Sequence, residues 1–142
     1  MTLILDSGPL VAAADRRDPA RAAAQNALLH ERGPFVLPAP ISAEVDYLVG
    51  KKLGRAARLG FVDDLATGRF LVDCLEPDDY AALAGLERQY ADLDPGLADL
   101  SIVVLARRFG TRRILTFDER HFRAIRPLQG GSFTLLPADA KP

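Results

Sequence analysis

Short apolar segments alternate with longer helical segments along this chain, and this alternation restricts the possible folds more than any other feature. The apolar segments span three or four residues each, at residues 2–5, 35–37, 70–72, 113–116 and 133–136. Strands that alternate with helices of about ten or more residues form βαβ units, whose parallel sheet is covered by helices on both faces. We therefore predict an α/β fold of three α/β/α layers around a central parallel sheet of about five short strands.

Turn and capping residues predict where several of the helices begin and end. Asp18-Pro19 should open an alanine-rich helix that runs towards Glu31, and Asp94-Pro95 should open a helix through Phe109. Asp is a favoured N-cap residue, and Pro is favoured in the first helical turn. A stripe of apolar residues with helical spacing over residues 41–53 predicts a further helix with one buried face.

Length and composition indicate an ordinary globular protein. The 142 residues suit one compact domain, which we expect to fill residues 1–142. The formal net charge of −1 gives no overall basic field of the kind that advertises a nucleic-acid binder. No apolar run is long enough to cross a membrane, and the N-terminus lacks the features of a signal peptide, so we expect a cytoplasmic protein.

Cys74 is the only cysteine of the chain. A single cysteine excludes an internal disulfide and any metal site built from several thiolates. We expect Cys74 to be reduced and to lie in the core, as lone cysteines of cytosolic proteins commonly do.

Four carboxylates stand at positions where this fold could bring them together. Asp6 and Asp118 each follow an apolar strand, and Glu44 lies beside the apolar stripe of its helix. Asp99 lies in residues 97–106, a segment that is apolar nearly all round and should be largely buried. Because open α/β sheets bind ligands at the carboxyl ends of their strands, these four acids could converge on one crevice.

Each acid taken alone also has a structural explanation. Asp6 could cap the turn that follows it, and Asp118 could cap the short helix after it. Glu44 could be a solvated helix residue or could compensate backbone donors near its helix start. Asp99 fits no capping role inside its helix, although it could pair with an arginine at position 107 or 108.

Four like charges in one crevice repel one another and raise some of their pKa values. A hard divalent cation removes this problem, and Mg²⁺ or Mn²⁺ prefers carboxylate and water oxygens. Carboxylate ligands without cysteine or histidine indicate phosphate chemistry, in which the ions activate a water and neutralise charge on the phosphoryl oxygens.

The order LDSGPL, SAEVDYL, GLADLSIVVLA and ILTFDERHF resembles a PIN domain, specifically the VapC-type toxins of bacterial toxin–antitoxin pairs. The resemblance covers essentially the whole chain. Asp6, Glu44 and Asp99 match the core acidic triad of that family, and Asp118 matches its more variable fourth acid. Ser7 stands where the family commonly has a small hydroxyl residue near the metal site.

The resemblance implies a Mg²⁺- or Mn²⁺-dependent endoribonuclease that cuts structured RNA, typically transfer RNA or ribosomal RNA. Asp6, Glu44, Asp99 and Asp118 would be both its metal ligands and its catalytic residues. It also implies a VapB-like antitoxin as partner and a homodimer as the basic unit, with no membrane association.

Two other functions stay open at this point. A catalytically inactive PIN scaffold that only binds a partner would be indicated by the loss of one acid, and none is lost. A phospho-accepting signalling domain could use Asp73 as its acceptor. Such domains pair two acids after the first strand and need a lysine after the last strand, whereas this chain has Ser7-Gly8 and Pro137 there.

Two groups of basic residues could hold RNA phosphates. The group around Gly54 is interpreted as a solvated helix face, and the group that flanks Asp118 is favoured as the RNA-binding one. The groups are Lys51, Lys52, Arg55 and Arg58 for the first, and Arg120, Arg123 and Arg126 for the second.

The remaining polar residues near the acids are interpreted as structural. His30 and His121 lack zinc-ligand spacing and have no companions for a metal site, so we expect them to be structural or on the surface. Asp46 should point away from the Glu44 face of its helix, and Asp94 should be an N-cap.

Overall fold

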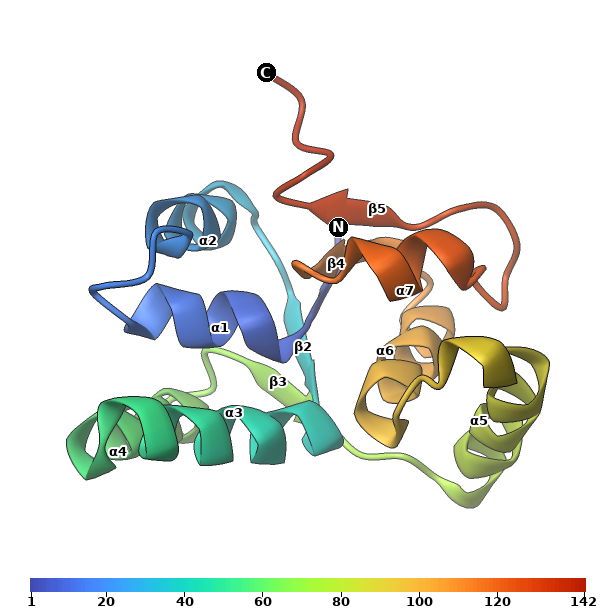
Figure 1. Ribbon diagram of the computed structural model, residues 1–142, viewed down its shortest axis with the longest axis horizontal. Coiled ribbons are helices and arrows are strands. Elements are labelled where there is room, and N and C mark those ends of the chain that lie inside the picture. The colour runs from blue at the N-terminus through green and yellow to red at the C-terminus, as the bar shows by residue number, and fades with distance from the viewer.

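A five-stranded parallel sheet forms the centre of the molecule, for which a computed structural model describes residues 1–142 (Figure 1). Its strand order is β3-β2-β1-β4-β5, and every neighbouring pair is parallel. The strands are β1 (Leu3–Leu5), β2 (Phe35–Pro38), β3 (Leu71–Asp73), β4 (Arg113–Leu115) and β5 (Thr134–Leu136).

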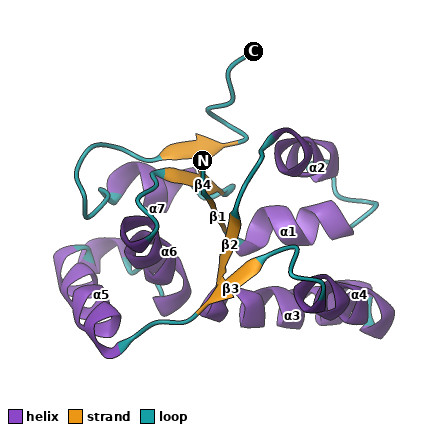
Figure 2. Ribbon diagram, turned by 180° about the vertical axis from the view of Figure 1, so that it is seen from behind, coloured by secondary structure: helices purple, strands orange, loops and turns teal.

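Helices cover both faces of this sheet, which confirms the predicted three-layer α/β/α fold (Figures 1 and 2). One side carries α1 (Ser7–Ala14), α2 (Arg21–His30), α3 (Ala39–Leu53) and α4 (Arg55–Ala66). The other side carries α5 (Pro77–Gln89), the 3₁₀ turn η1 (Ala91–Leu93), α6 (Leu97–Arg108) and α7 (Glu119–Ala124). No helix combines the length and the hydropathy that crossing a bilayer requires.

The core is built around β1 and α6. Leu3, Ile4 and Leu5 are fully buried because β1 is paired on both sides and covered on both faces. Every residue of α6 from Leu100 to Ala106 is buried, as its nearly continuous apolar sequence predicts. A single cluster of 28 buried residues joins these elements. That one domain fills residues 1–142 stays a prediction, which this single core supports.

The edge strand β3 is much more exposed than the central strands. It pairs only with β2, and the side chains of Leu71 and Val72 remain 50% and 39% exposed. Phe70, just before the strand, is buried and packs edge-to-face on Phe35. Cys74 follows this edge strand and is exposed, so the prediction of a core cysteine was wrong.

Two predicted helix starts were wrong by two residues each. The Asp18 carboxylate accepts a hydrogen bond from the Ala20 N–H (2.8 Å) in a turn before α2, whose N-cap is Ala20. Asp94 has a left-handed backbone (φ 46°) at the end of η1, and Gly96 is the N-cap of α6. Each Asp-Pro pair therefore forms the turn that leads into the helix, because the Asp side chain or backbone completes that turn first.

Stability should depend far more on the central strand than on the edge strand. We expect Leu3→Ala to lower the free energy of unfolding by about 2–5 kcal/mol, because it leaves a cavity in the core. The matched change Leu71→Ala, in the half-exposed β3, should cost less than about 1 kcal/mol. Urea denaturation of both variants checks this, and equal losses would contradict the central role of β1.

Candidate functional site

The acids gather where the sheet changes its direction of winding. From β1 the chain proceeds to β2 on one side, whereas β4 lies on the other side of β1. The carboxyl ends of β1 and β4 therefore form a topological switch point, where open α/β sheets bind their ligands, and we call this region the crevice. Asp6 follows β1 and its N–H donates to the Leu115 carbonyl at the end of β4 (2.9 Å).

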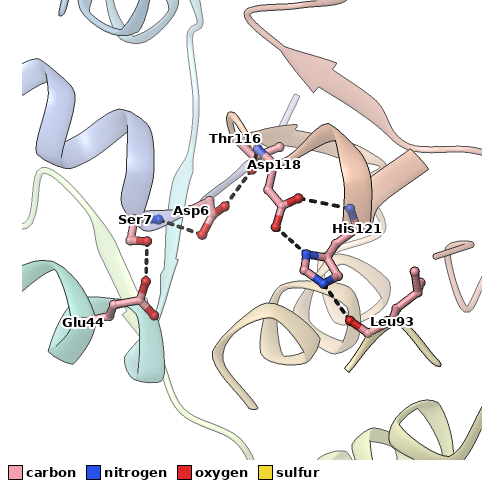
Figure 3. Close-up of polar contacts among 7 residues, drawn as sticks. All are labelled: Asp6, Ser7, Glu44, Leu93, Thr116, Asp118 and His121. Carbon is pink, nitrogen blue, oxygen red and sulfur yellow. Dashed lines mark hydrogen bonds and ion pairs between the residues drawn. The ribbon is translucent and has the colours of Figure 1, made fainter. Parts of the chain in front are cut away.

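Asp6 is buried, and each of its carboxylate oxygens accepts one hydrogen bond (Figure 3). Its Oδ1 accepts from the Ser7 N–H (2.8 Å), which makes Asp6 the N-cap of α1, and its Oδ2 accepts from the Thr116 hydroxyl (2.6 Å). Burial raises the pKa of Asp6, while these two hydrogen bonds oppose that rise and the charges of Glu44 and Asp118 add to it. The capping role and a place in the crevice therefore coexist in one side chain.

Thr116 connects two of the acids, and sequence analysis did not single it out. Its hydroxyl donates to Asp6 and accepts from the Asp118 N–H (2.9 Å), and the residue is almost completely buried. A polar residue at the end of an apolar strand, two positions before an acid, is the sequence signal that could have revealed it.

Glu44 extends from α3, and Asp6 lies between Glu44 and Asp118 in Figure 3. Its Oε1 accepts a hydrogen bond from the Ser7 hydroxyl (2.7 Å), which fixes that end of the carboxylate. Asp46 lies two residues further along the same helix and faces Arg58 instead, with 3.9 Å between the charged atoms. The structure thus separates these two acids as their helical spacing predicts.

Asp118 and His121 form a close pair at the start of α7 (Figure 3). The Asp118 Oδ1 accepts from the backbone N–H of His121 (3.0 Å), and its Oδ2 lies 2.6 Å from the His121 Nδ1. The Nε2 of the same ring lies 3.0 Å from the Leu93 carbonyl oxygen. The hydrogen bond with Asp118 is the main cause of a raised His121 pKa.

Asp99 completes the group from the first turn of α6. Ligand atoms of Asp99, Asp118 and His121 all lie within 4.8 Å of one another. The view that His121 has no companions was therefore wrong, because η1, α6 and α7 meet only in the folded chain. Burial raises the pKa of Asp99 to about 6, and the charges of Asp6, Asp118 and Glu44 raise it while that of His121 lowers it.

All four predicted acids therefore face one region, but they are not equally close. Asp6 and Glu44 lie outside the group whose ligand atoms fall within 4.8 Å, although each influences the charge of Asp99. The Asp99 and Asp118 carboxylates, with the His121 ring beside them, could hold a divalent metal ion.

Arginines do not neutralise this acidic group. Arg108, which sequence analysis offered as a partner for Asp99, forms ion pairs with Asp73 and Asp79 at the other end of α6. Among the basic residues that flank Asp118, Arg123 is held by Glu119 (3.0 Å) and Asp139 (2.7 Å).

Comparison with known proteins identifies this architecture. The PIN domain family model matches residues 3–127. The chain belongs to the PIN-domain family. This PIN domain is 36% identical to Ribonuclease VapC26 of Mycobacterium tuberculosis over 135 residues, which cover 95% of the chain and 100% of that relative. The resemblance found in the four sequence motifs is thereby confirmed.

Solved structures share the fold at low sequence identity. Mycobacterium tuberculosis VapC20, described as a Sarcin-Ricin loop cleaving toxin, matches with a TM-score of 0.77 and 13% identity over 82% of this PIN domain and 90% of that chain. VapBC2 from Rickettsia felis, bound to a DNA fragment from their promoter, matches with a TM-score of 0.66 and 16% identity over 95% and 97%. These matches confirm the PIN-like fold.

The raised pKa of Asp99 predicts a specific pH dependence in the metal-free protein. Its value in the folded chain is about 6, against an ordinary 3.8, so the protonated carboxyl stabilises the fold at low pH. That contribution is lost as the pH rises through about 6. Asp99→Asn, which stays neutral, should match the native protein near pH 4 and become the more stable of the two above pH 6.

Chemical denaturation with a chelator present, between pH 4 and pH 7.5, measures this difference. Asp63→Asn is the control, since Asp63 is exposed on α4 and far from the crevice in the fold. A stability difference between the Asp99 variant and the native protein that does not grow with pH would contradict the assignment.

Proposed function

We propose that this PIN domain is a Mg²⁺- or Mn²⁺-dependent endoribonuclease that hydrolyses phosphodiester bonds in structured RNA. The observation that carries the proposal is the crowding of Asp6, Glu44, Asp99 and Asp118 at the switch point of the sheet. Burial and mutual repulsion raise the pKa values of Asp6 and Asp99. A bound cation would offset this electrostatic cost of ionising the two acids. The 36% sequence identity to Ribonuclease VapC26, over 95% of this chain, supports the same activity.

The donor set fits a hard divalent cation. Asp99 and Asp118 would both bind the ion. Asp6 lies close enough for its charge to interact with the carboxylates of Asp99 and Asp118. Carboxylate oxygens suit Mg²⁺ and Mn²⁺. When bound, such an ion would activate water and offset the negative charge that develops on the scissile phosphate.

Hydrogen bonds from Ser7 and Thr116 would hold the acids of this site in position. Thr116 fixes Asp6 relative to Asp118, and Ser7 fixes Glu44 through Oε1, which leaves Oε2 without a hydrogen bond. Arg120 and Arg126, exposed and without ion pairs, could take RNA phosphates beside the acids. Arg123 is paired with two carboxylates, so an RNA phosphate would have to compete with them for it.

The substrate class is proposed from the relatives. VapC26 is a ribonuclease, and VapC20 is described as a toxin that cleaves the Sarcin-Ricin loop. Transfer RNA or ribosomal RNA is accordingly the expected target, which would place the activity in the cytoplasm.

The alternatives have less support. A catalytically inactive PIN module would not require the four acids to converge, and all four are present. Asp73, the acceptor in a phospho-accepting domain, is tied to Arg108 (2.8 Å) and to the Cys74 N–H (3.0 Å) at the edge of the sheet. Its carboxylate is therefore remote from the crevice between β1 and β4.

Metal binding and RNA cleavage should fail together when an acid is removed. We expect Mn²⁺ to raise the melting temperature at neutral pH, because it relieves repulsion among the acids. Glu44→Gln and Asp99→Asn should reduce cleavage of a structured RNA by on the order of 10²-fold or more. Thermal-shift titration and gel-based cleavage assays measure these effects.

Asp46→Asn is the matched control for Glu44→Gln, since both residues belong to α3 and only Glu44 faces the crevice. The control should retain metal binding and cleavage. Full cleavage by the Asp99→Asn variant, or no thermal response of the native protein to Mg²⁺ or Mn²⁺, would refute the proposal.

We further propose that the protein acts as a homodimeric toxin neutralised by a VapB-like antitoxin. The structural match to VapBC2 supports this partner class. An apolar groove of about 550 Å³ between α1, α2, α3 and α4 offers a place for an apolar antitoxin segment. Ten of its 14 lining residues are hydrophobic, and Leu29 on α2 is 78% exposed there.

Expression in a bacterial host tests the toxin role. The native chain should inhibit growth when expressed alone, and a small protein encoded beside it should restore growth. Leu29→Asp should still inhibit growth but resist neutralisation, because it places a charge in the groove. Leu59→Asp, also an exposed leucine but not part of the groove, should remain neutralisable. Normal growth with soluble, folded native protein would contradict the toxin role.

A further inference from the structure

The His121 ring lies between two hydrogen-bond acceptors that come from different parts of the chain (Figure 3). Its Nδ1 lies 2.6 Å from the Asp118 Oδ2, and its Nε2 lies 3.0 Å from the Leu93 carbonyl oxygen. A carbonyl oxygen can only accept, so Nε2 must be the donor in its contact. The side chain is mostly buried, with 17% of its surface exposed, which keeps the ring in this position.

The contacts of His121 fix both oxygens of the Asp118 carboxylate. Oδ2 faces the ring, and Oδ1 accepts from the His121 backbone N–H (3.0 Å). The Asp118 side chain has no other hydrogen bond or ion pair, and 31% of its surface is exposed. Its orientation therefore depends on the backbone N–H at position 121, which any residue other than proline would supply, and on the His121 ring, which holds Oδ2.

The other end of the ring is anchored to the segment that leads into α6. Leu93 ends η1, and the chain turns through the left-handed Asp94 before α6 begins at Leu97. The Leu93 carbonyl at the end of η1 thus holds the ring in place, and the ring in turn contacts Asp118 at the start of α7. The ring therefore links two segments that each carry an acid. One leads into α6 and its first-turn residue Asp99, and the other is the start of α7 with its N-cap Asp118.

We propose that His121 is a positioning residue that holds the Asp118 carboxylate in the orientation needed to share a cation with Asp99. The ring is anchored through Nε2 at Leu93 and presents Nδ1 to Asp118. Neither nitrogen is left free to coordinate an ion, so the ring acts through the carboxylate. This inference rests on the proposed function for the presence of a metal, but its test does not require RNA.

Three substitutions at one position separate the two contacts of the ring. In His121→Asn the side-chain amide replaces Nδ1 and can still donate to Asp118, but it cannot reach Leu93. In His121→Gln the longer amide can reach Leu93 but lacks a donor in the place of Nδ1. His121→Ala removes both contacts, and His30→Ala is the matched control because His30 contacts only Asn26 within α2.

The affinity of each full-length variant for Mn²⁺ is measured by calorimetry, and its metal-free melting temperature is recorded alongside. Loss of a group that orients a metal-binding side chain typically lowers metal affinity 10–100-fold. We expect losses in about that range for Gln and Ala, a clearly smaller loss for Asn, and none for the His30 control. In RNA cleavage, kcat should fall in the same order while KM stays unchanged.

Unchanged Mn²⁺ affinity in the Ala variant would overturn the inference. So would a Gln variant that binds as well as the native protein while Asn binds as poorly as Ala, since only the anchor at Leu93 would then matter. Equal losses in Asn, Gln and Ala would overturn it too, because they would make the ring itself a ligand. If the Ala variant does not fold, the Asn and Gln pair decides.

A failure of this inference can be told apart from a failure of the proposed function. Native protein that binds Mn²⁺ with the expected order of variants, but cleaves no RNA, would refute the ribonuclease proposal and leave the role of His121 intact. Native protein that binds Mn²⁺ and cleaves RNA, with all His121 variants unaffected, would refute only the role of His121.

Discussion

Burial of carboxylates near the carboxyl ends of β1 and β4, together with their mutual repulsion, is the constraint on which the site depends. The fold places Asp6 in a buried position and brings Asp99 near Asp118. The pKa values of Asp6 and Asp99 are therefore raised in the metal-free protein. A large apolar core compensates for this cost, since β1 and α6 are buried along almost their whole length. The stability of the scaffold thus permits an electrostatic arrangement that is unfavourable in the absence of a cation.

Short polar side chains keep the acids apart and in place. Ser7 and Thr116 each donate a hydroxyl to a different carboxylate, and the His121 ring contacts the Asp118 carboxylate through Nδ1. Each of these donors comes from a rigid element or from a residue next to one. The acids are therefore held in position in the metal-free protein, which would reduce the entropy cost of binding an ion.

Much of the fold and of the acidic group could be predicted from local patterns. The five short apolar segments predicted the five strands to within a residue or so, and the acids at Asp6 and Asp118 were recognisable because they end such strands. Helix starts were harder, because at Asp18 and Asp94 the Asp-Pro signal belongs to the turn before the helix. Cys74 was misplaced because a sequence pattern does not show which strand lies at the edge of the sheet.

The sequence by itself determined the alternation of strands and helices, the parallel sheet, and the identity of the acids, because these follow from periodicity and from residue type at strand ends. Only the tertiary structure decided which side chains meet. It brought η1 to α7, so that His121 joins Leu93 to Asp118, and it turned Arg108 away from Asp99 towards Asp73. Contacts of this kind join residues far apart in the chain, so they depend on the packing of whole helices and leave no signal in local sequence.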